Sequence, residues 1–150
     1  MLKAWRSRIM IFLAVLGPGF ITANVDNDAG GMMNTEYISL HEGATVADAL
    51  SALKGNEDQL ESLNAVFLVD PEGRLTGTVP LARLFVASPG TPLRELAAGT
   101  LISATVTEKQ DEVTELFDKY NLLALPVIDE DRRLAGVITA DDIISVLRHK

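Results

Sequence analysis

The sequence predicts an α+β fold made of two similar strand-helix-strand-strand-helix units that pack as a pair, preceded by a short N-terminal hydrophobic helix. Residues 66–85 recur as residues 125–144, at an offset of 59 positions. Repeats of this size are units that bury their apolar faces against one another. We therefore expect three parts: a hydrophobic segment at 1–31, a first repeat at 32–90 and a second repeat at 91–150.

Each repeat contains two apolar runs that are separated by an acidic turn and followed by a short helix. In the first repeat the runs lie around residues 66–69 and 75–80, and in the second around 125–128 and 134–139. Short runs rich in Val, Ile and Leu that are bounded by turn residues are typical of strands. Each repeat thus ends in two strands and a helix.

A helix and a short strand precede each pair of runs. Thr45 and Gly55 are typical first and last residues of a helix over 45–55. Thr107 and Gln110 have the spacing of a capping box, which predicts a helix over 111–120. Short strands are expected before these helices, at 37–40 and 101–105.

The composition excludes several functions. The formal net charge is -8, and acidic chains repel nucleic-acid backbones, so we expect no nucleic-acid partner. The chain has no cysteine and two histidines, which excludes thiolate metal sites and cysteine nucleophiles. No nucleophile–base–acid set or phosphate-transfer motif is present, so we expect no enzyme.

The first thirty-one residues form the predicted hydrophobic segment. Lys3, Arg6 and Arg8 precede an uncharged stretch at 9–23, which is shorter than the ~20 residues that cross a bilayer. Pro18 lies between two glycines and would interrupt a helix. A signal peptide is the alternative, although residues 21–23 make a poor cleavage site. We expect residues 1–31 to attach to a membrane transporter or a membrane surface.

Residues 17–28 resemble the first transmembrane segment of Nramp-type divalent-metal transporters. An apolar half-helix there runs into Asp26, Asn27 and Asp28, and broken helices of this kind carry ion sites in transporters. The resemblance implies that Asp26 is a metal ligand. Asn27, Asp28 and Ala29 replace the Pro, Gly and Asn of the better-known motif, so the second ligand is missing.

Residues 32–150 resemble a tandem pair of CBS domains. The order of elements and the second-repeat motifs at 125–129 and 136–142 carry the resemblance. Residues 29–38 and 141–147 also resemble the start and end of the CBS pair in MgtE-type magnesium channels. The resemblance implies a regulatory module, a homodimer formed through the CBS pair, and an adenine nucleotide ligand: ATP, ADP or AMP.

The candidate nucleotide site is centred on Thr139 and Asp142. Thr139 ends a strand and opens a helix, where backbone amides can hold a phosphate, and Asp142 can accept hydrogen bonds from ribose hydroxyls. The CBS resemblance adds Ile102, Ser103 and Pro126 to this site. The same Thr-x-x-Asp spacing is also an ordinary helix start, in which Thr139 caps the helix. The two roles can coexist.

The first repeat carries Pro80 and Arg83 at the equivalent positions. Proline has no amide hydrogen or hydroxyl, and arginine cannot accept a hydrogen bond from a ribose. One nucleotide site is therefore expected to dominate. Arg83 is either an exposed helix residue or a contact to a phosphate from the neighbouring site.

Carboxylates provide candidate metal ligands. Asp141 and Asp142 are adjacent at a helix start, and oxygen ligands with retained water suit Mg²⁺. A solvated acidic surface is the alternative.

The combined prediction is a regulatory CBS pair that senses adenine nucleotide, magnesium or both for a divalent-metal transport system, at the cytoplasmic face of the cell membrane. The alternative is a truncated or recombined fragment of a divalent metal cation transporter. A secreted or enzymatic domain is a third possibility.

Overall fold

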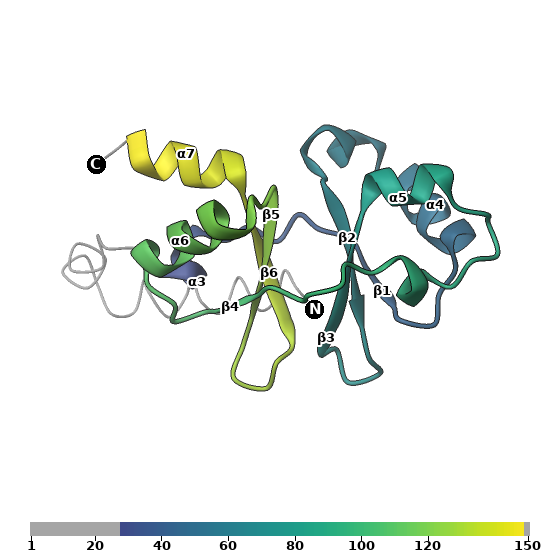
Figure 1. The fold of residues 1–150 in the computed structure, drawn as a ribbon, viewed down its shortest axis with the longest axis horizontal. Helices are drawn as coiled ribbons and strands as arrows, with labels where there is room; N and C mark the ends of the chain where they lie inside the picture. The colour runs from purple at the N-terminus through teal and green to yellow at the C-terminus, as the bar shows by residue number, and fades with distance from the viewer. Residues whose placement is uncertain (1–27, 149–150) are drawn as a thin grey trace. The chain divides into compact units, whose positions relative to one another are not determined.

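The computed structural model describes residues 28–148 (Figure 1). The predicted hydrophobic helix and Asp26 lie outside these residues. Within residues 28–148, no helix is long and apolar enough to cross a membrane.

The first repeat forms a three-stranded sheet with two helices on one face. Its strands are β1 (Ser39–His41), β2 (Ala65–Val69) and β3 (Leu75–Pro80), in the order β1-β2-β3. Strand β2 is parallel to β1 and antiparallel to β3. Helices α4 (Val46–Lys54) and α5 (Leu81–Val86) cover the sheet, and two 3₁₀ helices, η1 (Glu57–Ser62) and η2 (Leu93–Leu96), lie in the connections (Figure 1).

The second repeat forms a matching sheet. Its strands are β4 (Ala104–Thr105), β5 (Ala124–Ile128) and β6 (Leu134–Thr139), in the order β4-β5-β6. The helices α6 (Gln110–Tyr120) and α7 (Ala140–Arg148) belong to this repeat, and the short α3 (Ala29–Met32) precedes the first. The predicted α+β order is therefore confirmed in both repeats, although the first strand of each is shorter or later than predicted.

Local sequence defines the start of α4. The Thr45 hydroxyl accepts a hydrogen bond from the Asp48 amide at 3.3 Å, and the Asp48 carboxylate accepts one from the Thr45 amide at 2.9 Å. This capping box satisfies two amides that the helix leaves without partners. The predicted role of Thr45 is correct.

The predicted capping box at Thr107 is wrong. Helix α6 begins at Gln110, its N-cap is Lys109, and no side chain caps it. The Thr107 hydroxyl lies 3.3 Å from that of Thr105 instead. Lys109 is extended and pairs with Asp28 in an isolated bridge, and the Ala29 amide donates to the Glu108 carbonyl. This pairing between distant segments prevents the local cap.

The chain divides into two compact units, each made of discontinuous segments. Unit 1 contains residues 28–35, 104–127 and 135–148 of the described chain, and unit 2 contains residues 36–103 and 128–134. Sequence similarity divides the chain at residue 90, whereas compactness assigns residues 91–103 to the unit of the first repeat. The Leu93 amide illustrates this, because it donates to the Ala44 carbonyl at 2.8 Å.

Each unit buries apolar side chains of its own. In unit 2, a core cluster includes Val46, Leu68, Val79 and Leu84 from the helices and strands, together with Leu93 from η2. In unit 1, the fully buried side chains include Val113, Leu125 and Ile138. Both repeats thus provide the apolar faces that the sequence pattern predicts.

Candidate functional site

Thr139 and Asp142 form a reciprocal pair at the start of α7. The Thr139 amide donates to Asp142 Oδ2 at 2.9 Å, and the Asp142 amide donates to Thr139 Oγ1 at 3.2 Å. Both residues are half-buried. The helix-capping role of these residues, one of the two roles the sequence allows, is therefore present.

A third residue, Asn34, holds the Asp142 carboxylate from a distant part of the chain. Asn34 Nδ2 donates to Asp142 Oδ2 at 3.2 Å. The Asn34 backbone also exchanges two hydrogen bonds with Val137 of β6, at 2.8 and 2.9 Å. All of these residues belong to unit 1. Asp142 is consequently fixed by its own helix and by the segment before β1.

Gly136 allows this segment to approach β6. A Cβ atom at Gly136 would lie 2.5 Å from Met33 Sδ and 2.8 Å from the Asn34 carbonyl oxygen. Atoms at such distances would have to move, and the Asn34 carbonyl is held by its pairing with Val137. Glycine is therefore required here for close packing.

The hydrogen bonds leave one carboxylate oxygen for a ligand. Both bonds to the Asp142 side chain end on Oδ2, and Oδ1 takes part in neither. The amides of Thr139 and Ala140, in contrast, are used within the protein, since Ala140 donates to the Leu123 carbonyl at 2.9 Å. The site thus offers a carboxylate oxygen for a hydroxyl donor, with few amides for a phosphate.

The other predicted nucleotide residues lie on different elements. Pro126 is in the middle of β5 and its side chain is fully buried. Ile102 and Ser103 come directly before β4 and are half-buried. Compactness assigns these two residues to unit 2, whereas Pro126, Thr139 and Asp142 belong to unit 1.

The equivalent position in the first repeat is engaged with the protein itself. Arg83 is exposed on α5, and its Nη1 donates to the carbonyls of Leu96 and Ala97 at 2.9 and 3.2 Å. Pro80 precedes α5 without any side-chain cap. Arg83 therefore links α5 to the end of η2. In a symmetric module, this position would instead carry a carboxylate that accepts hydrogen bonds from a ligand.

The described carboxylates do not converge as metal ligands would. Within residues 28–148, no group of three His, Cys, Asp or Glu side chains could hold a metal ion. Asp141 is exposed, and in its neighbour Asp142 the Oδ2 atom is occupied by the cap. Magnesium at this pair would have to keep much of its water shell.

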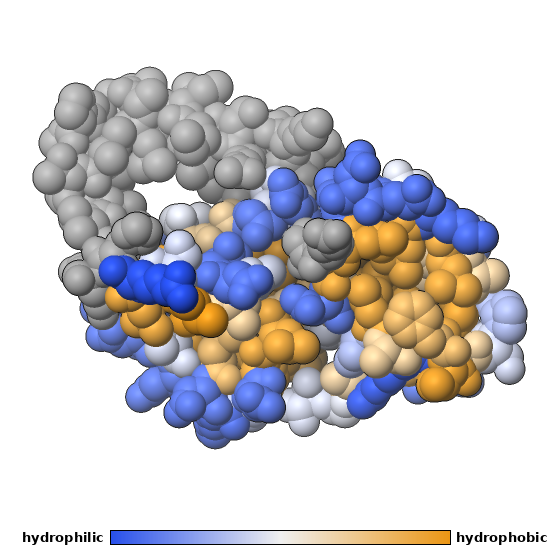
Figure 2. Space-filling model, turned by 90° about the horizontal axis from the view of Figure 1, so that it is seen from above, coloured by the Kyte–Doolittle hydropathy of each residue, from blue (hydrophilic) through white to orange (hydrophobic). Residues whose placement is uncertain are grey.

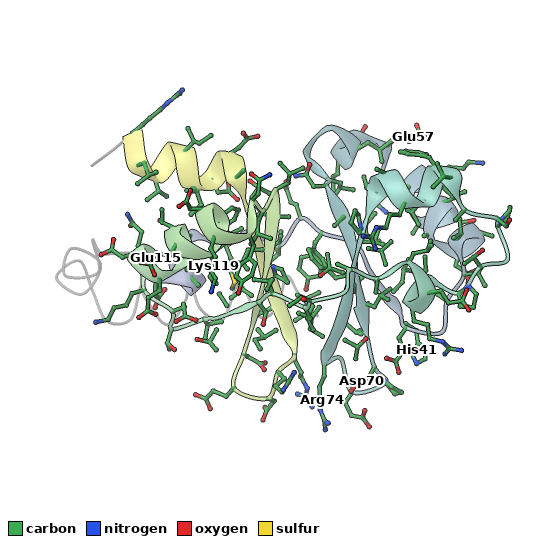
Figure 3. All side chains as sticks on the ribbon, viewed as in Figure 1. His41, Glu57, Asp70, Arg74, Glu115 and Lys119 are labelled. Carbon is green, nitrogen blue, oxygen red and sulfur yellow. The ribbon has the colours of Figure 1, made fainter. Side chains whose placement is uncertain are left out.

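Helix α6 carries four acidic side chains: Asp111, Glu112, Glu115 and Asp118. A hollow of about 510 Å³ beside it is lined by Glu108, Glu112, Glu115, Leu116, Asp118 and Lys119. Figure 3 shows Glu115 and Lys119 along this helix. A hydrogen bond with the Glu112 carboxyl raises the pKa of Glu108, since one proton between two carboxylates relieves their repulsion.

Asn34 is the site residue that sequence reasoning missed. It lies 108 residues from Asp142, and nothing in its local pattern indicates contact with α7. Gly136 is a sequence signal for this contact, because a glycine within a strand often marks the close approach of another backbone.

Comparison with known proteins settles the family. Residues 29–90 and 81–149 each match the model of the CBS domain. The chain belongs to the CBS-domain family. The match begins at residue 29, so the Nramp-like segment and the metal role of Asp26 stay predictions.

The most informative CBS relatives are magnesium transporters. The chain is 36% identical over 122 residues to the magnesium transporter MgtE of Thermus thermophilus, covering 81% of this chain and 27% of the transporter. It resembles the crystal structure of the cytosolic domain of the Mg²⁺ channel MgtE in complex with ATP, with a TM-score of 0.76 and 36% identity, covering 81% of this chain and 49% of that one. The chain thus spans about a quarter of the length of the transporter.

Some relatives carry the names of enzymes. One is the L-aspartate semialdehyde sulfurtransferase of Methanocaldococcus jannaschii, which is 28% identical over 109 residues, or 71% of this chain and 20% of the enzyme. Relatives of this chain thus include proteins named as transporters and proteins named as enzymes.

Proposed function

We propose that this CBS pair is a non-catalytic regulatory module of a divalent-metal transport system, and that it binds an adenine nucleotide. The observation that carries the proposal is the 36% identity to the cytosolic domain of the Mg²⁺ channel MgtE, whose crystal structure is a complex with ATP. The chain is also 36% identical to a magnesium transporter over a region that covers 81% of this chain. A location at the cytoplasmic face of the cell membrane follows from this role.

The proposed ligand contact is Asp142 Oδ1. Its sister oxygen is held by Thr139 and Asn34, which orient the carboxylate before a ligand arrives. A ribose hydroxyl could donate to Oδ1 without breaking either bond. Nucleotide binding and helix capping thus use different oxygens of one side chain. Thr139 and Pro126 of the same unit belong to the proposed site, and Ile102 and Ser103 stay predictions from the sequence. Magnesium would assist a triphosphate by offsetting its charge against the acidic chain.

Isothermal titration of the whole chain with AMP, ADP and ATP, with and without Mg²⁺, tests this proposal. Replacing Asp142 with alanine should weaken nucleotide binding by roughly ten- to a hundredfold, because a charged hydrogen-bond acceptor is lost. Asp48→Ala is the matched control, since it removes the equivalent capping carboxylate of α4. It should lower the melting temperature and leave nucleotide affinity unchanged. Equal affinity in the wild type and Asp142→Ala would exclude Asp142 from the site.

We also propose that the module forms a homodimer. Phe85 and Val86 of α5 are 75% and 88% exposed, and Ile144 and Leu147 of α7 are exposed as well. Hydrophobic surface is visible over the α4–α5 side of unit 2 (Figure 2). Exposed apolar groups of this kind mark interaction sites. Light scattering should give twice the chain mass for the wild type and the chain mass for a Phe85→Ser/Val86→Ser variant; a monomeric wild type would contradict the proposal.

A further inference from the structure

Two turns of unit 2 bring together residues that are equivalent in the two repeats. One turn joins β2 to β3 and contains Asp70 and Arg74, and the other joins β5 to β6 and contains Asp129 and Arg133. Arg74 and Arg133 face each other in an isolated antiparallel bridge. Figure 3 shows Asp70 and Arg74 at the tip of the first hairpin. The internal repeat thus places two equivalent arginines side by side.

Hydrogen bonds hold both turns in place. Asp70 Oδ1 accepts from the amides of Glu72 and Arg74, and Asp129 Oδ1 accepts from those of Asp131 and Arg133, all at 2.8 to 3.0 Å. Between the turns, the Leu75 amide donates to the Arg132 carbonyl at 3.0 Å and the Leu134 amide to the Gly73 carbonyl at 3.1 Å. Hydrogen bonds within each turn and between the two turns therefore hold the arginine backbones in place.

A surface hollow of about 340 Å³ lies over this platform. It is lined by three arginines and two carboxylates: Arg74, Arg132, Arg133, Glu130 and Asp131. All five belong to unit 2 and all are exposed. Arg133 uses Nε to donate to the Glu72 carbonyl at 3.0 Å, which leaves its two terminal nitrogens available. The lining carries a net positive charge in a chain of net charge -8.

Arg132 has a backbone conformation that suits glycine better. Its φ is +66°, and the equivalent residue of the first turn is Gly73, with a φ of +84°. An L-residue with a β-carbon is less stable than glycine in this left-handed region. Glycine would fit this turn with less strain, as Gly73 does in the first repeat. Here the side chain supplies the third guanidinium of the hollow.

We propose that this hollow binds a diphosphate group. Guanidinium groups match phosphate oxygens with paired hydrogen bonds, and three of them can engage two linked phosphates. The three guanidinium groups attract a multiply charged anion more strongly than a singly charged one, and Glu130 and Asp131 reduce this attraction without removing it. The diphosphate can belong to a free inorganic ion or to a nucleotide. This site is distinct from Thr139 and Asp142, which belong to unit 1.

Titration of the whole chain with inorganic pyrophosphate at low ionic strength tests the site. Replacing Arg132 with glycine should weaken pyrophosphate binding about tenfold or more while leaving the melting temperature unchanged or higher, since backbone strain is relieved. A purely structural role for Arg132 predicts unchanged pyrophosphate affinity and a lower melting temperature. Arg133→Gln should also weaken binding about tenfold, and added salt should weaken it further.

Two controls separate this site from general charge and from the proposed nucleotide site. Arg94→Gln removes one exposed arginine of unit 2 outside the hollow and should change affinity less than twofold. Asp142→Ala should leave pyrophosphate affinity unchanged. If Arg132→Gly weakens the binding of pyrophosphate but leaves the affinity for ADP unchanged, the hollow binds the free ion. No pyrophosphate binding by the wild type, equal binding by Arg132→Gly, or loss of binding in Asp142→Ala would overturn the proposal.

Discussion

Asp142 shows how one side chain serves structure and leaves room for a ligand. Its Oδ2 atom accepts hydrogen bonds from Thr139 and Asn34, which fixes the carboxylate, while Oδ1 takes part in neither bond. The sequence predicted the pairing with Thr139, because the spacing within one helix start is local. It did not predict Asn34, because that contact depends on how a segment 108 residues away is folded.

At the residue scale, Gly136→Ala should destabilise the protein. A methyl group there would meet Met33 and the Asn34 carbonyl oxygen at 2.5 to 2.9 Å, and the resulting overpacking costs about 1–3 kcal/mol. Urea unfolding followed by circular dichroism measures the change. Gly90→Ala is the control, because no heavy atom lies within 4 Å of its new methyl group. Equal stability of the two variants would show that the segment at Met33 moves away at no cost.

At the scale of elements, local signals were reliable only where no distant segment competes. Thr45 caps α4 as the sequence predicted, and Asp48 completes the box. Thr107 does not cap α6, because Glu108 and Lys109 pair with residues 28–29. Gln110 becomes the first residue of the helix and is buried, and its Nε2 has no hydrogen-bond partner among the described residues.

The carboxyl pair at the start of α6 predicts a pH dependence. The pKa of Glu108 is raised in the folded chain by its hydrogen bond with Glu112. A raised carboxyl pKa stabilises the fold below the unfolded pKa, and this contribution is lost as pH rises through the folded pKa. Glu108→Gln should therefore match the wild type in acid and exceed its stability near pH 7, by only about 0.3 kcal/mol because Glu112 is exposed and Glu108 is only half-buried.

Thermal melts of Glu108→Gln and the wild type measure this effect. A range of roughly pH 4 to pH 8 covers the titration of the carboxyl groups. Glu57→Gln is the control for net charge, since Glu57 lies on η1 and outside the α6 hollow. A constant difference between Glu108→Gln and the wild type across this range would contradict the carboxyl pair.

At the scale of the whole molecule, the repeat predicted two units but not their composition. Similar apolar patterns identify both repeats. The segment before β1, however, pairs with β6 of the second repeat, and residues 91–103 pack with the first repeat. Periodicity within a repeat reports which faces are apolar, and it carries no information on which copy receives a connecting segment.

Residues 28–35 should therefore be needed for full stability. They bury Ala29 and Met32, donate from Ala29 and Gly30 to the carbonyls of Glu108 and Val106, and pair Asn34 with Val137. A chain that starts at residue 28 should unfold cooperatively, because both repeats and this segment are present. A chain that starts at residue 36 should lose about 3 kcal/mol or more, since it exposes β6 and gives up buried apolar area and several hydrogen bonds. Urea unfolding and near-ultraviolet circular dichroism of the two chains measure the difference; equal stability would mean that the pairing with β6 contributes nothing, and Asp142 would then keep its orientation without Asn34.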